Sequence, residues 1–308
     1  SNTEVNSSGC FGKCIDNYKK VGGICIVNDG SIEDCIVVGS KLKGEYHSSG
    51  ICDENTGVIA ECQVYETALD SEKSVNGICR YNDGEISDCL IYDTKLKGGD
   101  DSNGIALENE GKVTDCDITD SELTSESSAS GISKNNMGEI ICCEVSGTNY
   151  YSEFVIGLVF KNEGDIHESK VNKNKLKAEN RFFGVCKSNG GTLTNSVLSK
   201  SDFISNTDYE TENGGLVESN YGDISNCIVQ DISTKYKHSC MLLARINNGT
   251  IEGCIVDSDH IVPDEFVGGV MKGEVESCIA VSEFDSNGFI DGVSTADSMD
   301  KAKTIAML

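Results

Sequence analysis

The side chains of this chain that could do chemistry are its carboxylates, its thiols and its few histidines. An acidic residue recurs at one position of a repeated pattern, as Asp34, Glu61, Asp88 and Asp115. Carboxylates stacked about 5 Å apart repel one another, and a divalent cation would relieve that repulsion. The column is consistent with a solvated acidic face, with a weak Ca²⁺ site on these four residues, or with paired carboxylates for glycoside cleavage. We favour the solvated face.

Thiols form the second set. Five of the sixteen cysteines lie 27 residues apart, and the pattern returns with small deviations further on; the ladder positions are Cys35, Cys62, Cys89, Cys116, Cys143, Cys227 and Cys254. In-register side chains point the same way and lack the geometry of a disulfide, whereas a free thiol packs well in an apolar core. We therefore expect most of these cysteines to be free and buried.

Other reactive patterns are weak. The four histidines occupy different positions of the repeat and share no metal-ligand spacing, and there is no Cys-x-x-Cys pair. No nucleophile elbow or phosphate-binding loop stands in a fitting context. We expect no catalytic residue and no cofactor, apart from the Ca²⁺ considered above. Tyr150, Tyr151, Phe154 and Phe160 form a mild aromatic cluster whose exposed members could stack on sugars, and the repeat places Tyr150 in the core.

The elements that position these side chains follow from the repeat itself. Apolar residues lie three before and two after each ladder position, as Ile32 and Val37 do around Cys35. Period-two alternation that is broken by Asn-x-Gly predicts about three short strands per unit, joined by corners. The asparagine stands seven residues before the ladder position, at Asn28, Asn55, Asn82, Asn109 and Asn136 in the first five units.

A period of this length, kept along the chain, is typical of a repeat architecture. If each unit lies on the previous one, apolar columns fill the interior and the asparagine amides can hydrogen-bond along a corner. The sequence therefore predicts an all-β fold, a right-handed parallel β-helix (β-solenoid) of about ten 27-residue coils with a C-terminal capping helix.

Three segments are expected. Residues 1–22 fit the pattern poorly and read as an N-terminal cap or irregular first coil, and residues 23–293 carry the β-solenoid repeats. Residues 294–308 read as the capping helix, with Ser294 or Thr295 as its N-cap and apolar spacing through Met299, Ala302 and Ile305.

The unit Gly-apolar-x-x-x-Asn-x-Gly-x-Ile-x-x-Cys-x-Val resembles the GLUG-type repeats of bacterial surface and secreted proteins. It is seen at Gly23 to Val37, Gly50 to Val64, Gly77 to Ile91 and Gly215 to Val229. The resemblance implies an extracellular or cell-surface β-solenoid that is often one part of a larger adhesin-like protein. It carries no catalytic residue to this chain, which departs from the family in its regular 27-residue period and its many cysteines.

Charge narrows the range of partners. The formal net charge is −26 at pH 7, and such a surface repels the phosphate backbone, so we expect no nucleic acid partner. No apolar run approaches the roughly 20 residues that a membrane helix needs, so we expect no membrane insertion.

These observations predict a non-enzymatic cell-surface or secreted repeat protein that serves in adhesion or as a structural spacer presenting loops. A host or cell-surface protein or a glycan would be its partner. Two alternatives stay open: a carbohydrate-active β-helix enzyme of the polysaccharide lyase or glycoside hydrolase type, and a Ca²⁺-stabilised structural module. Pectin-cleaving enzymes share the architecture, but architecture does not imply function.

Overall fold

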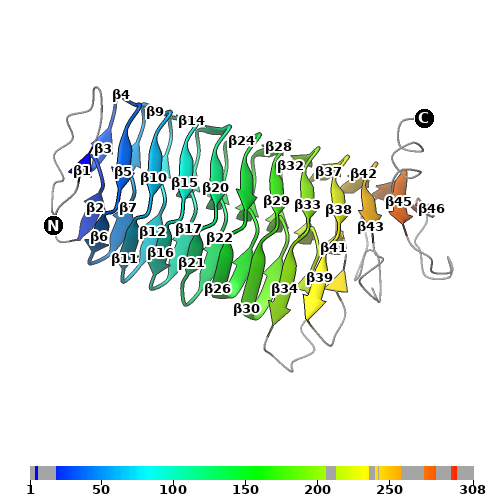
Figure 1. Cartoon of the computed structure of the whole chain (residues 1–308). Helices are drawn as coiled ribbons and strands as arrows, with labels where there is room; N and C mark the ends of the chain where they lie inside the picture. Colours follow the sequence, from blue (N-terminus) through cyan, green and yellow to red (C-terminus); the bar gives the residue numbers. More distant parts are fainter. Residues whose placement is uncertain are drawn as a thin grey trace.

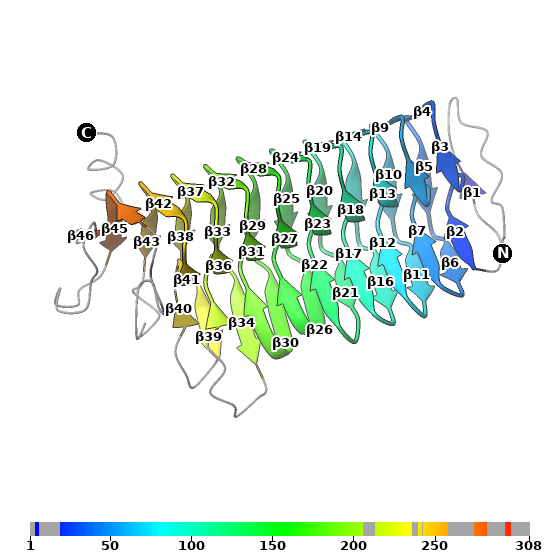
Figure 2. The same cartoon turned by 180° about the vertical axis from the view of Figure 1, so that it is seen from behind.

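The computed structural model describes residues 4–5, 19–205, 213–235, 240–241, 243–257, 274–281 and 293–296 of the 308-residue chain. These residues form a parallel β-solenoid of about eight turns, with no helix among them. The coils follow one another in chain order along one rod (Figure 1, Figure 2). No helix in the described part is long and apolar enough to span a membrane.

Sheet A contains one strand from each coil. The middle residue of most of these strands, such as Val37 in the first coil, points into the core and lies two residues after the ladder position. The strands of sheet A are parallel except for the first, which pairs antiparallel with the second. They are β1 (Glu4–Val5), β5 (Ile36–Val38), β10 (Gln63–Tyr65), β15 (Leu90–Tyr92), β20 (Asp117–Thr119), β25 (Glu144–Ser146), β29 (Lys170–Asn172), β33 (Val197–Ser199), β38 (Ile228–Gln230), β43 (Ile255–Asp257), β45 (Cys278–Val281) and β46 (Val293–Ala296).

Sheet B follows sheet A in each coil and has two rows, which the long strands β26 and β30 join. The first row is β6 (Lys41–Gly44), β11 (Ala68–Ser71), β16 (Lys95–Gly98), β21 (Glu122–Thr124), β34 (Asp202–Ser205) and β39 (Ser233–Lys235). The second row is β2 (Lys20–Gly22), β7 (His47–Ser49), β12 (Ser74–Asn76), β17 (Asp101–Asn103), β22 (Ser128–Ser130), β35 (Asn213–Gly214) and β40 (Cys240–Met241). The joining strands are β26 (Asn149–Ile156) and β30 (Lys175–Phe183).

Sheets C and D complete each coil. Sheet C contains β3 (Val27–Asn28), β8 (Glu54–Asn55), β13 (Cys79–Asn82), β18 (Ala106–Asn109), β23 (Ser133–Asn136), β27 (Val159–Asn162), β31 (Cys186–Asn189), β36 (Val217–Asn220) and β41 (Ala244–Asn247). Sheet D contains β4 (Ser31–Glu33), β9 (Val58–Ala60), β14 (Glu85–Ser87), β19 (Lys112–Thr114), β24 (Glu139–Ile141), β28 (Asp165–His167), β32 (Thr192–Thr194), β37 (Asp223–Ser225), β42 (Thr250–Glu252) and β44 (Glu274–Glu276).

Like positions of successive coils stack in register. In sheet A, Val37 lies beside Val64, and Val64 lies beside Ile91. At a strand spacing of about 4.8 Å, the eight or so turns make a rod about 40 Å long. Most coils contain five strands, not the three expected, because the chain also turns between the two rows of sheet B and again between sheets B and C. The coils of β26 and β30 contain four, since each of these strands spans both rows.

The turn from sheet B to sheet C depends on glycine. A Cβ atom on Gly77 would lie 1.9 Å from the carbonyl oxygen of Gly104 and 2.3 Å from Cδ1 of Ile91 in sheet A. The backbone at this turn therefore packs directly against the next coil and against the core, and only a residue without a side chain fits there.

Two other corners of each coil use residues with positive φ. One comes just before the ladder position, as at Asp88 (φ 52°), and the other five residues later, as at Asp93 (φ 43°). The residue after a corner points inward, and at most of these corners its side chain donates to the carbonyl group two residues earlier. Cys89 Sγ donates to the Ser87 oxygen at 3.2 Å, and Thr94 Oγ1 to the Tyr92 oxygen at 2.9 Å. The corners thus favour a small side chain that can donate a hydrogen bond.

The thiol ladder lies in the core. Cys62, Cys89, Cys116 and Cys143 are buried and free. The neighbouring Cys89 thiol, together with burial, raises the pKa of Cys62, so its thiol stays protonated and unreactive at neutral pH. Cys35 is also buried, but it is disulfide-bonded and so departs from the free thiol that we expected.

The asparagine ladder is a continuous chain of amide hydrogen bonds. Asn82 Nδ2 donates to Asn109 Oδ1 at 2.7 Å, and Asn109 Nδ2 to Asn136 Oδ1 at 2.7 Å. The same contact, at 2.7 to 2.9 Å, joins Asn28 to Asn55, Asn55 to Asn82, Asn136 to Asn162, Asn162 to Asn189, Asn189 to Asn220 and Asn220 to Asn247. Each amide is buried, so the ladder satisfies polar groups that water cannot reach.

The helix expected over residues 294–308 is not confirmed. Ser294, Thr295 and Ala296 belong to β46, which pairs in parallel with β45, and residues 297–308 lie outside the described part. Thr295 and its neighbours extend sheet A because the unpaired edge of β45 offers backbone donors and acceptors. The expected count of ten coils is not confirmed either. At the other end, β2 lies in register with β7, so Lys20 to Gly22 already follow the repeat.

Substitution of Cys89 tests the thiol ladder. We expect Cys89→Ser to lower the free energy of unfolding by only about 1 kcal/mol, since Ser169 and Ser196 occupy the same position and bond the equivalent carbonyl at 3.0 Å. Cys89→Leu overpacks the column and should cost about 1–3 kcal/mol. Chemical denaturation measures both, and equal tolerance of the two variants would contradict the interior position.

Substitution of Asn109 tests the amide ladder. Asn109→Ala leaves Asn82 Nδ2 without its amide acceptor and Asn136 Oδ1 without its donor, so we expect a loss of about 2–4 kcal/mol. The half-buried Asn135 on the same strand is the matched control, and Asn135→Ala should cost under about 0.5 kcal/mol. Denaturant melts that show the same cost for both variants would refute a structural role for the ladder.

Candidate functional site

The acidic column lies at an exposed corner of the rod. Asp34, Glu61, Asp88 and Asp115 are all exposed, and each has a φ of 52° or 53°. Cys142, Asn195 and Gly253 take the same corner conformation in other coils. Aspartate, asparagine and glycine are the residues that most readily adopt positive φ, so the backbone accounts for much of the composition of this column.

The column does not gather into a metal site. Within the described part of the chain, no three His, Cys, Asp or Glu side chains are grouped so that they could hold a metal ion. The carboxylates are stacked one per coil along the surface instead of converging, and a Ca²⁺ ion needs six to eight oxygen ligands around one point. This geometry gives the Ca²⁺ alternative no support beyond the repeated charge.

A second group of polar side chains lies where the chain passes from sheet B to sheet C. Here a residue from the second row of sheet B meets a residue at the start of sheet C in the next coil. Lys20 meets Asp53, and Asp101 meets Lys134. We call this group the polar seam; it comprises Lys20, Asp53, Arg80, Asp101, Lys134, Arg181, Glu218 and Arg245, with Ser49, Asn76, Asn103 and Ser130 beneath them.

The charges of the polar seam alternate in sign along the rod. Asp53 Oδ2 lies 2.9 Å from Lys20 Nζ on one side and 2.9 Å from Arg80 Nη2 on the other. Glu218 Oε1 lies 2.6 Å from Arg181 Nη1 and 3.3 Å from Arg245 Nη2. Asp53 and Glu218 are therefore each held between two cations of neighbouring coils, and Asp101 is held by Lys134.

Burial sets these pairs apart from the rest of the surface. Asp53 is 0% exposed and Glu218 5%, while Asp101 and Arg80 are 7% and 8% exposed. The chain has three arginines, and all of them, Arg80, Arg181 and Arg245, lie in the polar seam. Arginine suits this place because its planar guanidinium holds its charge and pairs with a carboxylate in fixed geometry.

Beneath the ion pairs lies a row of small polar residues. Asn103 Nδ2 donates to Asn76 Oδ1 at 3.1 Å. Asn76 Nδ2, Asn103 Oδ1 and the hydroxyl oxygens of Ser49 and Ser130 are buried and, within the described residues, have no hydrogen-bond partner. Internal waters satisfy polar atoms of this kind in folded proteins.

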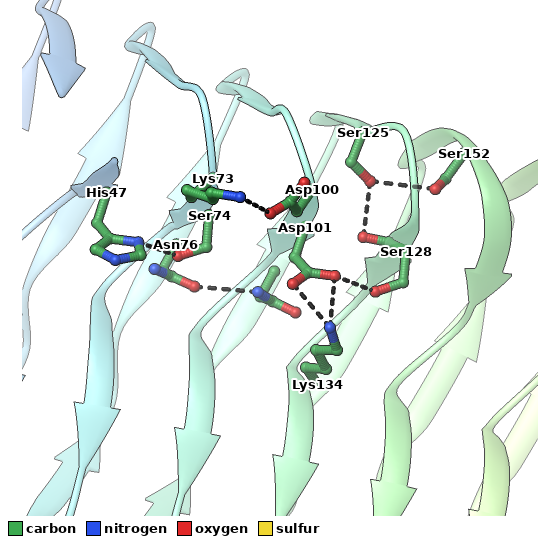
Figure 3. A network of polar contacts seen from close by, with 11 residues as sticks. His47, Lys73, Ser74, Asn76, Asp100, Asp101, Ser125, Ser128, Lys134 and Ser152 are labelled. Atoms are coloured by element: carbon green, nitrogen blue, oxygen red, sulfur yellow. Dashed lines mark hydrogen bonds and ion pairs between the residues drawn. The ribbon is translucent and has the colours of Figure 1, made fainter. Parts of the chain in front are cut away.

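Figure 3 shows the central part of the polar seam. Asp101 accepts two bonds from Lys134 Nζ, both at 2.8 Å, and one from Ser128 Oγ at 2.6 Å. His47 Nδ1 lies 2.8 Å from Ser74 Oγ. Burial, followed by the positive charge of Arg80, lowers the pKa of His47, so the ring is neutral at pH 7.

The seam does not have the arrangement of a catalytic acid and base. A catalytic acid or base must reach its substrate at hydrogen-bond distance with a proton or lone pair that no fixed partner holds. The carboxylates of Asp53, Asp101 and Glu218 are each paired with a cation at 2.6 to 2.9 Å. Such pairs fix one coil against the next.

The sequence pattern did not reveal this group. One signal was present: opposite charges one repeat apart, at Asp53 and Arg80 and again at Glu218 and Arg245. The diagonal pairs of Lys20 with Asp53 and Asp101 with Lys134 are 33 residues apart, and this spacing has meaning only once the turn between sheets B and C is known.

The aromatic cluster divides between core and surface. Tyr150 is buried, as its position in the repeat predicts, and its hydroxyl donates to the Gly157 oxygen at 3.2 Å. Phe154 and Phe160 meet edge to face at 6.3 Å, with Lys187 Nζ within 4.6 Å of both ring centroids. Tyr151 is 39% exposed on the outer face of sheet B.

No protein-family model, curated protein or solved structure matches this chain. The likeness to GLUG-type repeats therefore rests on the motif alone.

Removal of one seam charge tests whether the ion pairs hold the coils. Glu218→Gln keeps the side-chain shape but removes the carboxylate charge that Arg181 and Arg245 contact, and we expect a loss of about 3 kcal/mol. The exposed pair of Lys161 and Glu163 is the control, and Glu163→Gln should cost under about 1 kcal/mol. Denaturation at one salt concentration compares them, and a similar small cost at both sites would exclude a stabilising role for the seam.

Proposed function

We propose that this chain is a non-enzymatic rod, secreted or displayed at the cell surface, that serves in adhesion or as a spacer. The observation that carries this proposal is the pairing of the buried carboxylates. Asp53, Asp101 and Glu218 are the acids that break the repeat and are protected from water, and each lies against a lysine or arginine of another coil. Side chains that hold coils together in this way are engaged in structure.

The stacked ladders support the same proposal. Inward positions repeat from coil to coil, and the amide hydrogen bonds run from Asn28 to Asn247 without a gap. A rod built in this way keeps its surface in a fixed position over its length, as a spacer or adhesive scaffold requires. We include in the proposal the finer features expected from the sequence, a right-handed winding and about ten coils up to Cys278.

The enzyme alternative has less support from the geometry. Glycoside cleavage requires two carboxyl groups facing one substrate bond, one of them protonated. The acids of the exposed corner are stacked one per coil, and the buried acids Asp53, Asp101 and Glu218 each lie against a cation.

Incubation of the purified chain with pectin, xylan, cellulose and chitin separates these functions. We expect the protein to be retained on a polysaccharide or on whole cells, and to release no reducing ends and no unsaturated products. Product formation that scales with protein concentration would overturn the proposal. Antibody labelling of intact producing cells tests the location, and signal only after lysis would contradict surface display.

A further inference from the structure

The outer face of sheet B carries a surface feature that the repeat does not explain. Tyr151, the third residue of β26, occupies a column in which the neighbouring coils have Lys97, Thr124 and Lys177. It is the one aromatic residue among these four. Among the lysines and Thr124 of this column, one aromatic ring is therefore open to solvent.

The ring of Tyr151 is held in a defined orientation. Its hydroxyl donates to Glu179 Oε1 at 2.6 Å, and Lys177 Nζ lies 5.0 Å from the ring centroid. The hydrogen bond to Glu179 raises the pKa of the Tyr151 phenol, which therefore remains a neutral donor. A fixed ring loses little conformational freedom when a ligand covers it.

Two hollows adjoin this ring. The first, of about 450 Å³, is lined by Tyr151 with Lys97, Gly99, Glu126 and Glu179 among others. The second, of about 330 Å³, is lined by Tyr151 with Glu122, Lys175 and Lys177 among others. Both volumes lie at the lower end of the range for small-molecule sites.

Glycine contributes to the first hollow. Gly99 follows β16 at a position where the coils on either side have Glu72 and Glu126. A Cβ atom at Gly99 would lie 2.0 Å from the carbonyl oxygen of Glu72, so the backbone conformation in this coil requires glycine. The lack of a side chain leaves open the wall beside Tyr151.

The lining groups indicate the chemical class of the ligand. An aromatic face takes the C–H surface of a ring, and carboxylates and ammonium groups bond hydroxyls strongly. The charged residues that line the first hollow are Lys97, Glu126 and Glu179. Those that line the second hollow are Glu122, Lys175 and Lys177. The charges of the two hollows balance, which favours a neutral polyhydroxylated ligand over an acidic one.

We propose that Tyr151 and its two hollows bind a neutral oligosaccharide, with one sugar ring stacked on Tyr151 and its neighbour in the adjoining hollow. The inference rests on the proposed function as an adhesive rod and names the ligand class and the site.

Calorimetric titration of the full chain with cellotetraose, chitotetraose and mannotetraose tests this site, with tetragalacturonate as the acidic comparison. We expect at least one neutral tetrasaccharide to bind. Tyr151→Ala should weaken that binding at least about tenfold, and Tyr151→Phe, which keeps the ring, should stay within about threefold. Thr124→Arg places a long side chain in the first hollow and should also weaken binding at least about tenfold.

Tyr92, which is 43% exposed on sheet A, provides the matched control. Tyr92→Ala should leave affinity unchanged, and thermal melts should show that every variant is folded. Binding of none of the neutral tetrasaccharides, binding of tetragalacturonate alone, or an equal effect of Tyr92→Ala and Tyr151→Ala would each overturn the inference.

The failure of this site is distinguishable from the failure of the proposed function. If Tyr151→Ala adheres to cells or polysaccharide as well as the unaltered chain does, the saccharide site is refuted while the adhesive rod stands. If the unaltered chain cleaves polysaccharide, the proposed function is refuted whatever Tyr151 does.

Discussion

Every interior position of this solenoid must be compatible with a copy of itself one strand away. In-register pairing of parallel strands brings like residues together at about 4.8 Å, and it does so at each point around the coil. Branched apolar residues meet this condition by packing, as Val37, Val64 and Ile91 do. Asparagine meets it because one amide carries both a donor and an acceptor, so a chain of amides can satisfy itself. Thiols and hydroxyls meet it by bonding to their own backbone.

Charged residues cannot meet the same condition unless their sign alternates. The polar seam follows this rule: Asp53 lies between Lys20 and Arg80, and Glu218 between Arg181 and Arg245. The acidic column does not alternate in sign. Its carboxylates, Asp34, Glu61, Asp88 and Asp115, are exposed at a corner of the rod, where water screens their repulsion. The two groups of carboxylates thus differ in burial, since those of the polar seam are buried and paired with cations and those of the acidic column are exposed to water.

The period, the strands and the parallel stacking could be predicted from the sequence, because stacking imposes one residue type on each interior column. Cys89 and Asn109 stand out for that reason. The polar seam could not be predicted as readily, because its contacts are diagonal and depend on how sharply the chain turns at residues such as Gly77. Corner conformations were missed because exposed aspartate has several explanations, and positive φ is one of them. The N-cap predicted at Ser294 or Thr295 is not found, because the open edge of β45 pairs with these residues as a strand.

The polar seam also bears on how the gene for this rod can change. Tandem units of equal length are prone to gain or lose a copy when DNA strands misalign during replication or recombination. Excision of residues 117–143 would keep every ladder in phase, yet it would bring Asp101 next to Phe160 in place of Lys134. A buried carboxylate facing a phenyl ring is strongly disfavoured. The inward columns alone would tolerate the loss of this coil, whereas the ion pair of Asp101 with Lys134 would be broken by it, so selection against a buried unpaired carboxylate would oppose this deletion.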